Sequence, residues 1–218
     1  RDDGFLPEAL LNYLARLGWS HGDQEIFSLE ELVQLFDLSA VNKAASAFNP
    51  DKLLWLNQHY LKTSDPAHVA RHLSWHVGQL GIDPSEGPAL IEVVKAFRER
   101  TRALKEMAEN SAFLYQGLTN YDEKAANKNL TAAAETPLRR LNEVLATLPE
   151  WCAESIHAAV ARVAEDTGLL LGQGAQPVVA VSGTAVSPPI DLTLELLGRP
   201  KTLARIQRAL EYLQQRPN

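Results

Sequence analysis

The sequence contains few of the residues that build cross-linked or membrane-bound proteins. Its 218 residues include a single cysteine, Cys152. One cysteine excludes a disulfide framework and a cysteine-rich zinc site, and is typical of a protein kept in a reducing cytoplasm. No apolar run approaches the roughly 20 residues of a membrane-spanning helix, and no signal sequence precedes Gly4. We therefore expect a cytoplasmic protein with no membrane partner.

The sequence also lacks an excess of positive charge and the common catalytic motifs. Its formal net charge is -6 at pH 7, which is unusual for a nucleic-acid binder. A local basic stripe remains compatible with this total, because screening at physiological salt acts over about 8 Å. The phosphate-binding G-x-x-x-x-G-K-[ST], the dinucleotide-binding G-x-G-x-x-G and the metalloprotease H-E-x-x-H are missing. We therefore predict no catalytic, cofactor-binding or metal-binding residue in this chain.

Amphipathic helices dominate what is present. Ser28 and Glu31 have the spacing of a capping box, which marks a helix start. A first-turn proline predicts further starts at Pro7 and after Asn49. Periodic apolar residues predict one continuous helix from Pro88 to about Glu109 and a last helix from Pro200 to about Gln215. Only the region near 172–191 breaks the pattern, and its prolines, glycines and valines predict an extended, non-helical segment. The fold class is therefore predicted to be an all-α array of helices with one extended segment.

Three histidines recur four residues apart in the helix predicted after Pro66. His68, His72 and His76 lie close enough for neighbours to share a metal ion. The same spacing is typical of a polar flank on an amphipathic helix, and no carboxylate within the helix completes a ligand set. We favour the polar flank and predict no metal site.

Two predicted helices carry basic stripes opposite their apolar faces. In the helix from Pro88, four cations fall within an arc of about 80°: Lys95, Arg98, Arg102 and Lys105. The last helix has a similar line of Lys201, Arg205, Arg208 and Tyr212. Such a stripe is either a solvated face that covers the core or a surface that contacts phosphates, with Tyr212 available for stacking. The stripes alone leave both interpretations open.

Arg100 departs from its stripe. On the helical wheel it lies about 40° from the centre of the apolar arc, between Val93 and Met107. A guanidinium placed toward packed side chains needs carboxylate, carbonyl or nucleobase acceptors, because an unpaired buried charge is costly. A structural salt bridge and a contact with an RNA base are the two interpretations of Arg100.

Several segments together resemble the C-terminal, anticodon-binding half of bacterial glutamyl-tRNA synthetases. They follow the family's order along the chain: "GFLPEALLNYLARLGWSHGDQEIFSLEEL", "NPDKLLWLNQHYL", "RTRALKEM", "AQPVVAVSG" and "SPPIDLTLELLGRPKTLARIQRAL". The resemblance implies an elongated, superhelical all-α fold with glutamate tRNA as its partner. It also implies that the ligase chemistry, with ATP and magnesium, resides in a Rossmann-type catalytic domain of the same polypeptide. This chain alone is then expected to be inactive and to hold no cofactor.

The resemblance further implies three regions and a set of tRNA contacts. Residues 1–63 correspond to a stem-contact region, and residues 64–120 and 121–218 to two anticodon-binding helical subdomains. Arg100 matches an arginine that reads the third anticodon base, which is cytosine in glutamate tRNAs and guanine in glutamine tRNAs. Trp55 is equally compatible with a place in the core. The full set of implied tRNA contacts is Arg100, Gln176, Pro177, Ser187, Pro188, Ile190, Lys52, Trp55 and Asn57.

One segment departs from the family pattern. The family usually has Gly-Lys before the anticodon pocket and Pro-Leu-Arg within it, whereas here Gln173 follows Gly172 and Val178 follows Pro177. An arginine expected near the anticodon is therefore absent, and Arg162 is a candidate replacement. A helical protein-interaction scaffold without an RNA role is the alternative function. We expect a monomer.

Overall fold

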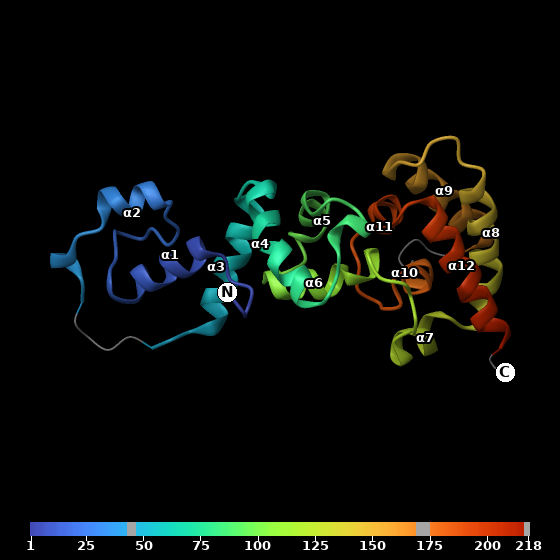
Figure 1. Cartoon of the computed structure of the whole chain (residues 1–218), viewed down its shortest axis with the longest axis horizontal. Coiled ribbons are helices and arrows are strands. Elements are labelled where there is room, and N and C mark those ends of the chain that lie inside the picture. Colours follow the sequence, from blue (N-terminus) through green and yellow to red (C-terminus); the bar gives the residue numbers. More distant parts are fainter. Residues whose placement is uncertain (43–46, 169–174, 216–218) are drawn as a thin grey trace.

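The computed structural model describes residues 1–42, 47–168 and 175–215, and these form an elongated array of helices. Within those ranges no β-strand forms, and the only bridge pairs His21 with Gln24. Figure 1 shows α1 and α2 at one end of the long axis and α7 to α12 at the other. The predicted all-α class is confirmed. No helix in the described ranges is long and apolar enough to cross a membrane.

The first three helices begin where their capping signals predict. Helix α1 (Pro7–Gly18) starts on a proline, and α2 (Leu29–Leu35) starts after Ser28 with both hydrogen bonds of the capping box. Helix α3 (Pro50–Thr63) starts after Asn49, whose side chain accepts the Lys52 amide. A proline in the first turn sacrifices no helical hydrogen bond, so these starts follow from local chemistry.

The middle of the molecule contains α4 (Pro66–Gln79), α5 (Leu90–Phe97) and α6 (Leu104–Ser111), with α4 packed on both of the others. The prediction of one continuous helix from Pro88 to Glu109 is wrong, because residues 98–103 form a turn. The buried hydroxyl of Thr101 donates to the Phe97 carbonyl, and the Glu106 carboxylate accepts the Arg102 amide. The Glu106 carboxylate replaces the carbonyl that the Arg102 amide would have bonded in a continuous helix, so the helix can end and the chain change direction here.

Six helices form the other end: α7 (Glu123–Asn129), α8 (Glu135–Ala146), α9 (Ala153–Thr167), α10 (Ala175–Ser182), α11 (Ile190–Leu197) and α12 (Arg199–Gln214). The predicted extended segment near 172–191 is wrong over residues 175–182, which are helical, while residues 172–174 lie outside the described ranges. Val179, Ala180 and Val181 are fully buried, so core packing outweighs the weak preference of valine for strands. Only residues 183–189, between α10 and α11, are non-helical as expected.

Most of the apolar side chains join one continuous core that extends from Leu6 to Leu210. A smaller cluster of Trp19, Phe27 and Leu32 lies under α2. Four short 3₁₀ turns connect helices: Leu38–Ala40, Pro84–Glu86, Ala112–Leu114 and Ala132–Ala134. Because one core extends through both ends, displacement of a central helix is transmitted to its neighbours.

The basic stripe on α12 is bonded to neighbouring backbone, with Arg205 buried and Lys201 and Arg208 at the surface. Arg205 is 7% exposed and donates to the carbonyls of Val181, Phe113 and Gln116. Lys201 and Arg208 likewise donate to backbone carbonyls, and Tyr212 packs on Tyr121. Burial lowers the pKa of the Arg205 guanidinium, and the three carbonyls offset part of that cost. The stripe therefore holds the segment after α6 against α12.

Replacing Arg205 by methionine leaves these three carbonyls without their donor. We expect Arg205→Met to lower the free energy of unfolding in urea by about 2–4 kcal/mol, since buried acceptors lose hydrogen bonds to a charged group. Arg139→Met is the control, because Arg139 is exposed and pairs only with Glu135 one turn away. That variant should cost less than about 0.5 kcal/mol. Equal losses in the two variants would contradict the role assigned to Arg205.

Candidate functional site

The structure brings together two predicted site residues that are far apart in the sequence. Arg100 lies in the turn between α5 and α6, and its Nη1 donates to the Ser187 carbonyl over 3.4 Å. Helices α5 and α11 pack side by side, which places the 98–103 turn against the loop of residues 183–189. Arg100 itself is exposed, so the expectation that it points into packed side chains is wrong. Its one bond is long, and donors of the guanidinium stay available at the surface.

The loop of residues 183–189 is fixed by its own side chains. Ser187 and Pro188 are buried, and the Pro188 carbonyl accepts from the hydroxyls of Ser187 and Thr193. The exposed positions are residues 184–186 and 189, and Val186 is 56% exposed. Ser187 and Pro188 thus shape the loop, while Thr184, Ala185 and Val186 form its outer surface. Sequence reasoning missed these three because no motif marks them.

Gln176 and Pro177 lie half-buried in the first turn of α10. Gln176 borders a hollow of about 540 Å³ that Ala185 also lines, so α10 and the loop share this surface. Its Oε1 is buried and has no hydrogen-bond partner within the described residues. Lys124 and Lys128, one turn apart on α7, line the same hollow and form no ion pair with any described residue. They are basic residues that sequence reasoning missed, although their spacing of four was visible.

The basic stripe predicted from Lys95 to Lys105 does not form, because its helix is interrupted. Lys95, on α5, pairs with Glu92 at 2.8 Å. Arg98 is half-buried at the end of α5, and Arg102 and Lys105 lie on the other side of the turn. Ile190, the last of the predicted anticodon-site residues, begins α11 and is half-buried.

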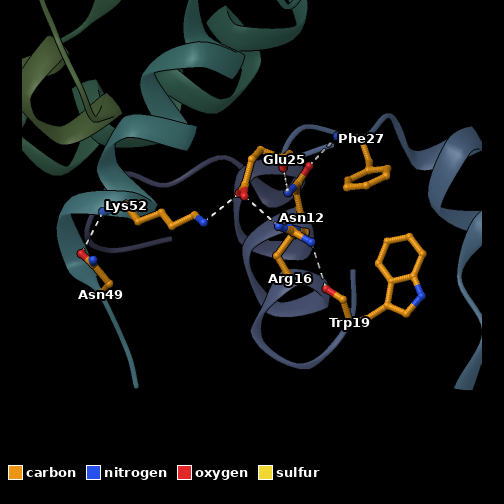
Figure 2. A network of polar contacts seen from close by, with 7 residues as sticks. All are labelled: Asn12, Arg16, Trp19, Glu25, Phe27, Asn49 and Lys52. Atoms are coloured by element: carbon orange, nitrogen blue, oxygen red, sulfur yellow. Dashed lines mark hydrogen bonds and ion pairs between the residues drawn. The ribbon is translucent and has the colours of Figure 1, made fainter. Parts of the chain in front are cut away.

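Three predicted contacts lie on α3, away from α10 and α11 along the molecule (Figure 1). Lys52 is exposed and pairs with Glu25 at 2.7 Å, and Glu25 also binds Arg16. Figure 2 shows this network between α1, the segment before α2 and the first turn of α3. Trp55 is 46% exposed, so it lies at the surface and not in the core. Asn57, in contrast, is completely buried and bonded to backbone groups.

The histidines of α4 differ in their surroundings, although the rings of His68 and His72 contact each other edge to face. His68 contacts the carboxylate of Glu8 on α1, whereas His76 is 4% exposed. Burial lowers the pKa of His72 and of His76, which favours neutral imidazoles. No group of three or more potential ligands that could hold a metal ion occurs in the described part of the chain. His68 forms a polar flank as predicted, and His76 belongs to the interior.

Comparison with protein families gives two matches. Residues 67–210 match the family described as an anticodon binding domain. Residues 1–55 match the catalytic domain of class I tRNA synthetases (E and Q). The second match covers α1, α2 and the beginning of α3, so the boundary between the two families falls within or just after α3.

Individual relatives agree with these families. The chain is 56% identical to glutamate--tRNA ligase 1 of Nitrosococcus oceani, covering 100% of this chain and 47% of that protein. It is 54% identical to glutamate--tRNA ligase 2 of Halorhodospira halophila, covering 99% and 46%. The crystal structure of a glutamate tRNA ligase from Elizabethkingia meningosepticum, in complex with its amino acid, aligns with a TM-score of 0.82 at 28% identity, over 96% of this chain and 42% of that one. The chain spans about half the length of the curated relatives it matches.

The Glu25 network predicts a contribution to acid stability. Hydrogen bonds from Lys52 and then Arg16 lower the pKa of the Glu25 carboxyl below its usual 4.5. A lowered pKa in the folded state stabilises the protein above pH 4.5, and this stabilisation disappears as the pH falls through the lowered value. We expect the Glu25→Gln variant to show a flatter dependence of unfolding free energy on pH between about pH 3 and 5. If the unfolding free energies of the two proteins depend on pH in the same way over this range, the network contributes nothing to acid stability.

Proposed function

Because this chain belongs to the anticodon-binding-domain family and is similar throughout to glutamate–tRNA ligases, we propose that it recognises the anticodon of glutamate tRNA. A complete ligase of this kind joins glutamate to its tRNA with ATP and magnesium, and we propose that the chain serves such an enzyme as a monomer. The described residues offer no metal-ligand group and the sequence no phosphate loop. We assign the reaction to the catalytic domain of the same polypeptide, whose family model matches residues 1–55 of this chain.

The contact between Arg100 and Ser187 is the observation that supports this proposal most directly. It joins the turn and the loop that carry the predicted anticodon contacts, which are 87 residues apart in the chain. A guanidinium beside an irregular loop provides donors, and exposed loop residues provide backbone groups, for the edges of unstacked bases. The hollow beside Gln176 is lined by Lys124, Lys128 and Asp122, and the two lysines outweigh the one carboxylate, so it suits an RNA phosphate.

The three-region division carries over into this proposal. Residues 1–63 hold Lys52 and Trp55 at the surface of α3, where they would contact the tRNA stem. Residues 64–120 contribute Arg100, and residues 121–218 contribute Gln176 and the loop. A helical scaffold without an RNA role gains no support from the relatives, which are tRNA ligases.

Arg100 gives the first test of this function. Cytosine offers acceptors to a guanidinium, whereas the Watson–Crick edge of guanine presents two N–H donors beside its single acceptor. We expect Arg100→Gln to weaken binding of an anticodon stem-loop with cytosine at the third position by about 1–3 kcal/mol, and to affect the guanine-bearing stem-loop far less. Lys124→Gln is the control and should weaken both RNAs alike, because Lys124 lines the hollow assigned to a phosphate. If Arg100→Gln leaves the ratio of the dissociation constants for the two stem-loops unchanged, Arg100 does not recognise this base.

Salt dependence and resonance mapping give the second test. Binding of the stem-loop should weaken steeply as salt rises, because each neutralised phosphate releases counterions. In an amide-shift titration, the resonances of residues 175–190 should move more than those of the His68–His76 segment of α4. A map centred on α4, or binding insensitive to salt, would show that another surface or another kind of partner is used.

A further inference from the structure

Asn57 is completely buried, although the resemblance places it among the tRNA contacts. Its Oδ1 accepts the Leu6 amide at 2.8 Å, and its Nδ2 donates to the Arg102 carbonyl at 2.6 Å. The same Nδ2 lies 3.4 Å from the Gly4 carbonyl. One side chain of α3 thus ties the segment before α1 to the turn between α5 and α6. A buried amide with all these partners has no surface left for RNA.

Gly4 completes this junction from the other side. Its carbonyl accepts the Leu104 amide, the first of α6, at 2.9 Å. The residue has a φ of +85°, and a Cβ there would lie 2.5 Å from the Lys105 nitrogen and 2.8 Å from the Leu104 nitrogen. Glycine is required because both the conformation and the close approach exclude a side chain. The junction therefore has little room to move.

The 98–103 turn is held by α3 on both sides of Arg100. Lys62, further along α3, pairs with Glu99 at 3.1 Å, while Asn57 holds the Arg102 carbonyl. On the far side, the Glu106 carboxylate accepts the Arg102 amide at 2.8 Å. Side chains from α3 and α6 thus bond both backbone groups of Arg102, two residues after Arg100, and Lys62 adds an exposed ion pair with the side chain of Glu99. The Arg100 side chain itself has only the long bond to Ser187.

We propose that Asn57 is a positioning residue that fixes the turn carrying Arg100 and so maintains discrimination between cytosine and guanine at the third anticodon position. This inference rests on the proposed function. The attraction between a cation and a phosphate is weakly directional and tolerates small displacements of the side chain. A hydrogen bond to a base edge is lost when the donor moves by about an ångström. A more mobile turn should therefore reduce the preference for cytosine-bearing over guanine-bearing RNA more than it weakens the binding of both RNAs.

The chain offers a matched control in its other fully buried asparagine, Asn12 on α1. Its Oδ1 accepts the Phe27 amide at 2.7 Å and its Nδ2 donates to the Glu25 carbonyl at 2.9 Å, as Figure 2 shows. The Asn12 Oδ1 also accepts the Tyr60 hydroxyl of α3 at 2.9 Å, so Asn12, like Asn57, is a buried amide with three partners. It holds the segment before α2 and makes no bond to the 98–103 turn. Replacing either residue by alanine removes equivalent bonds, so we expect a similar loss of fold stability. Only Asn57→Ala removes a bond to the turn that carries Arg100.

The experiment measures the ratio of dissociation constants for cytosine-bearing and guanine-bearing stem-loops with the full chain. We expect Asn57→Ala to reduce the preference for cytosine about fivefold, the lower end of the effect of one base contact, and Asn12→Ala to change it less than about twofold. Unfolding in urea, measured in parallel, should show comparable losses for the two variants. The proposal is wrong if both variants change the preference for cytosine equally, or if Asn57→Ala does not change it.

A second variant keeps the test informative if Asn57→Ala fails to fold. Glu106→Ala removes the other bond to Arg102 without opening the core, since Glu106 is only half-buried. It should also lower the preference for cytosine, and an unchanged ratio would count against a fixed turn. If the wild-type chain fails to distinguish the two RNAs, the result contradicts the proposed function. The role proposed for Asn57 is then also wrong, because it depends on that function.

Discussion

Irregular backbone between helices must find partners for its N–H and C=O groups, and in this chain buried polar side chains supply many of them. Asn12 binds the segment before α2, Asn57 binds the ends of two segments at the centre, and Arg205 binds three carbonyls at the far end. Each of these side chains replaces hydrogen bonds that a helix would otherwise make internally. The directions in which successive helices run depend on this constraint, and so does the position of the candidate site.

The distribution of charge follows from the same constraint. The chain is acidic overall, and the stripe on α12 is one of its basic surfaces, yet Lys201, Arg205 and Arg208 all donate to carbonyls of the protein. The cations that remain at the candidate site come from irregular or short elements: Arg100 in a turn, and Lys124 and Lys128 on the short helix α7. Local placement, and not net charge, thus determines where an anion can bind.

The proposed anticodon surface combines the 98–103 turn with residues about 75–90 positions later in the sequence. The 98–103 turn, the first turn of α10 and the 183–189 loop each lie at the end of a helix, where backbone groups are exposed and side chains diverge. Rigid helices behind them supply the orientation: α3 and α6 hold the turn, and α12 holds α10 through Arg205. Anchoring on both sides limits the movement of these irregular segments, which a site that distinguishes bases would require.

The sequence by itself determined the helical class, the helix starts at Ser28 and Asn49, and the last helix, because capping and apolar periodicity act over a few neighbouring residues. The resemblance likewise singled out Arg100 and Ser187, which the structure joins. Only the tertiary structure decided that the helix from Pro88 breaks at residues 98–103, that residues 175–182 are helical, and that Asn57 is buried. Local preferences amount to less than about 1 kcal/mol per residue, so hydrogen bonds and burial supplied by distant segments outweigh them.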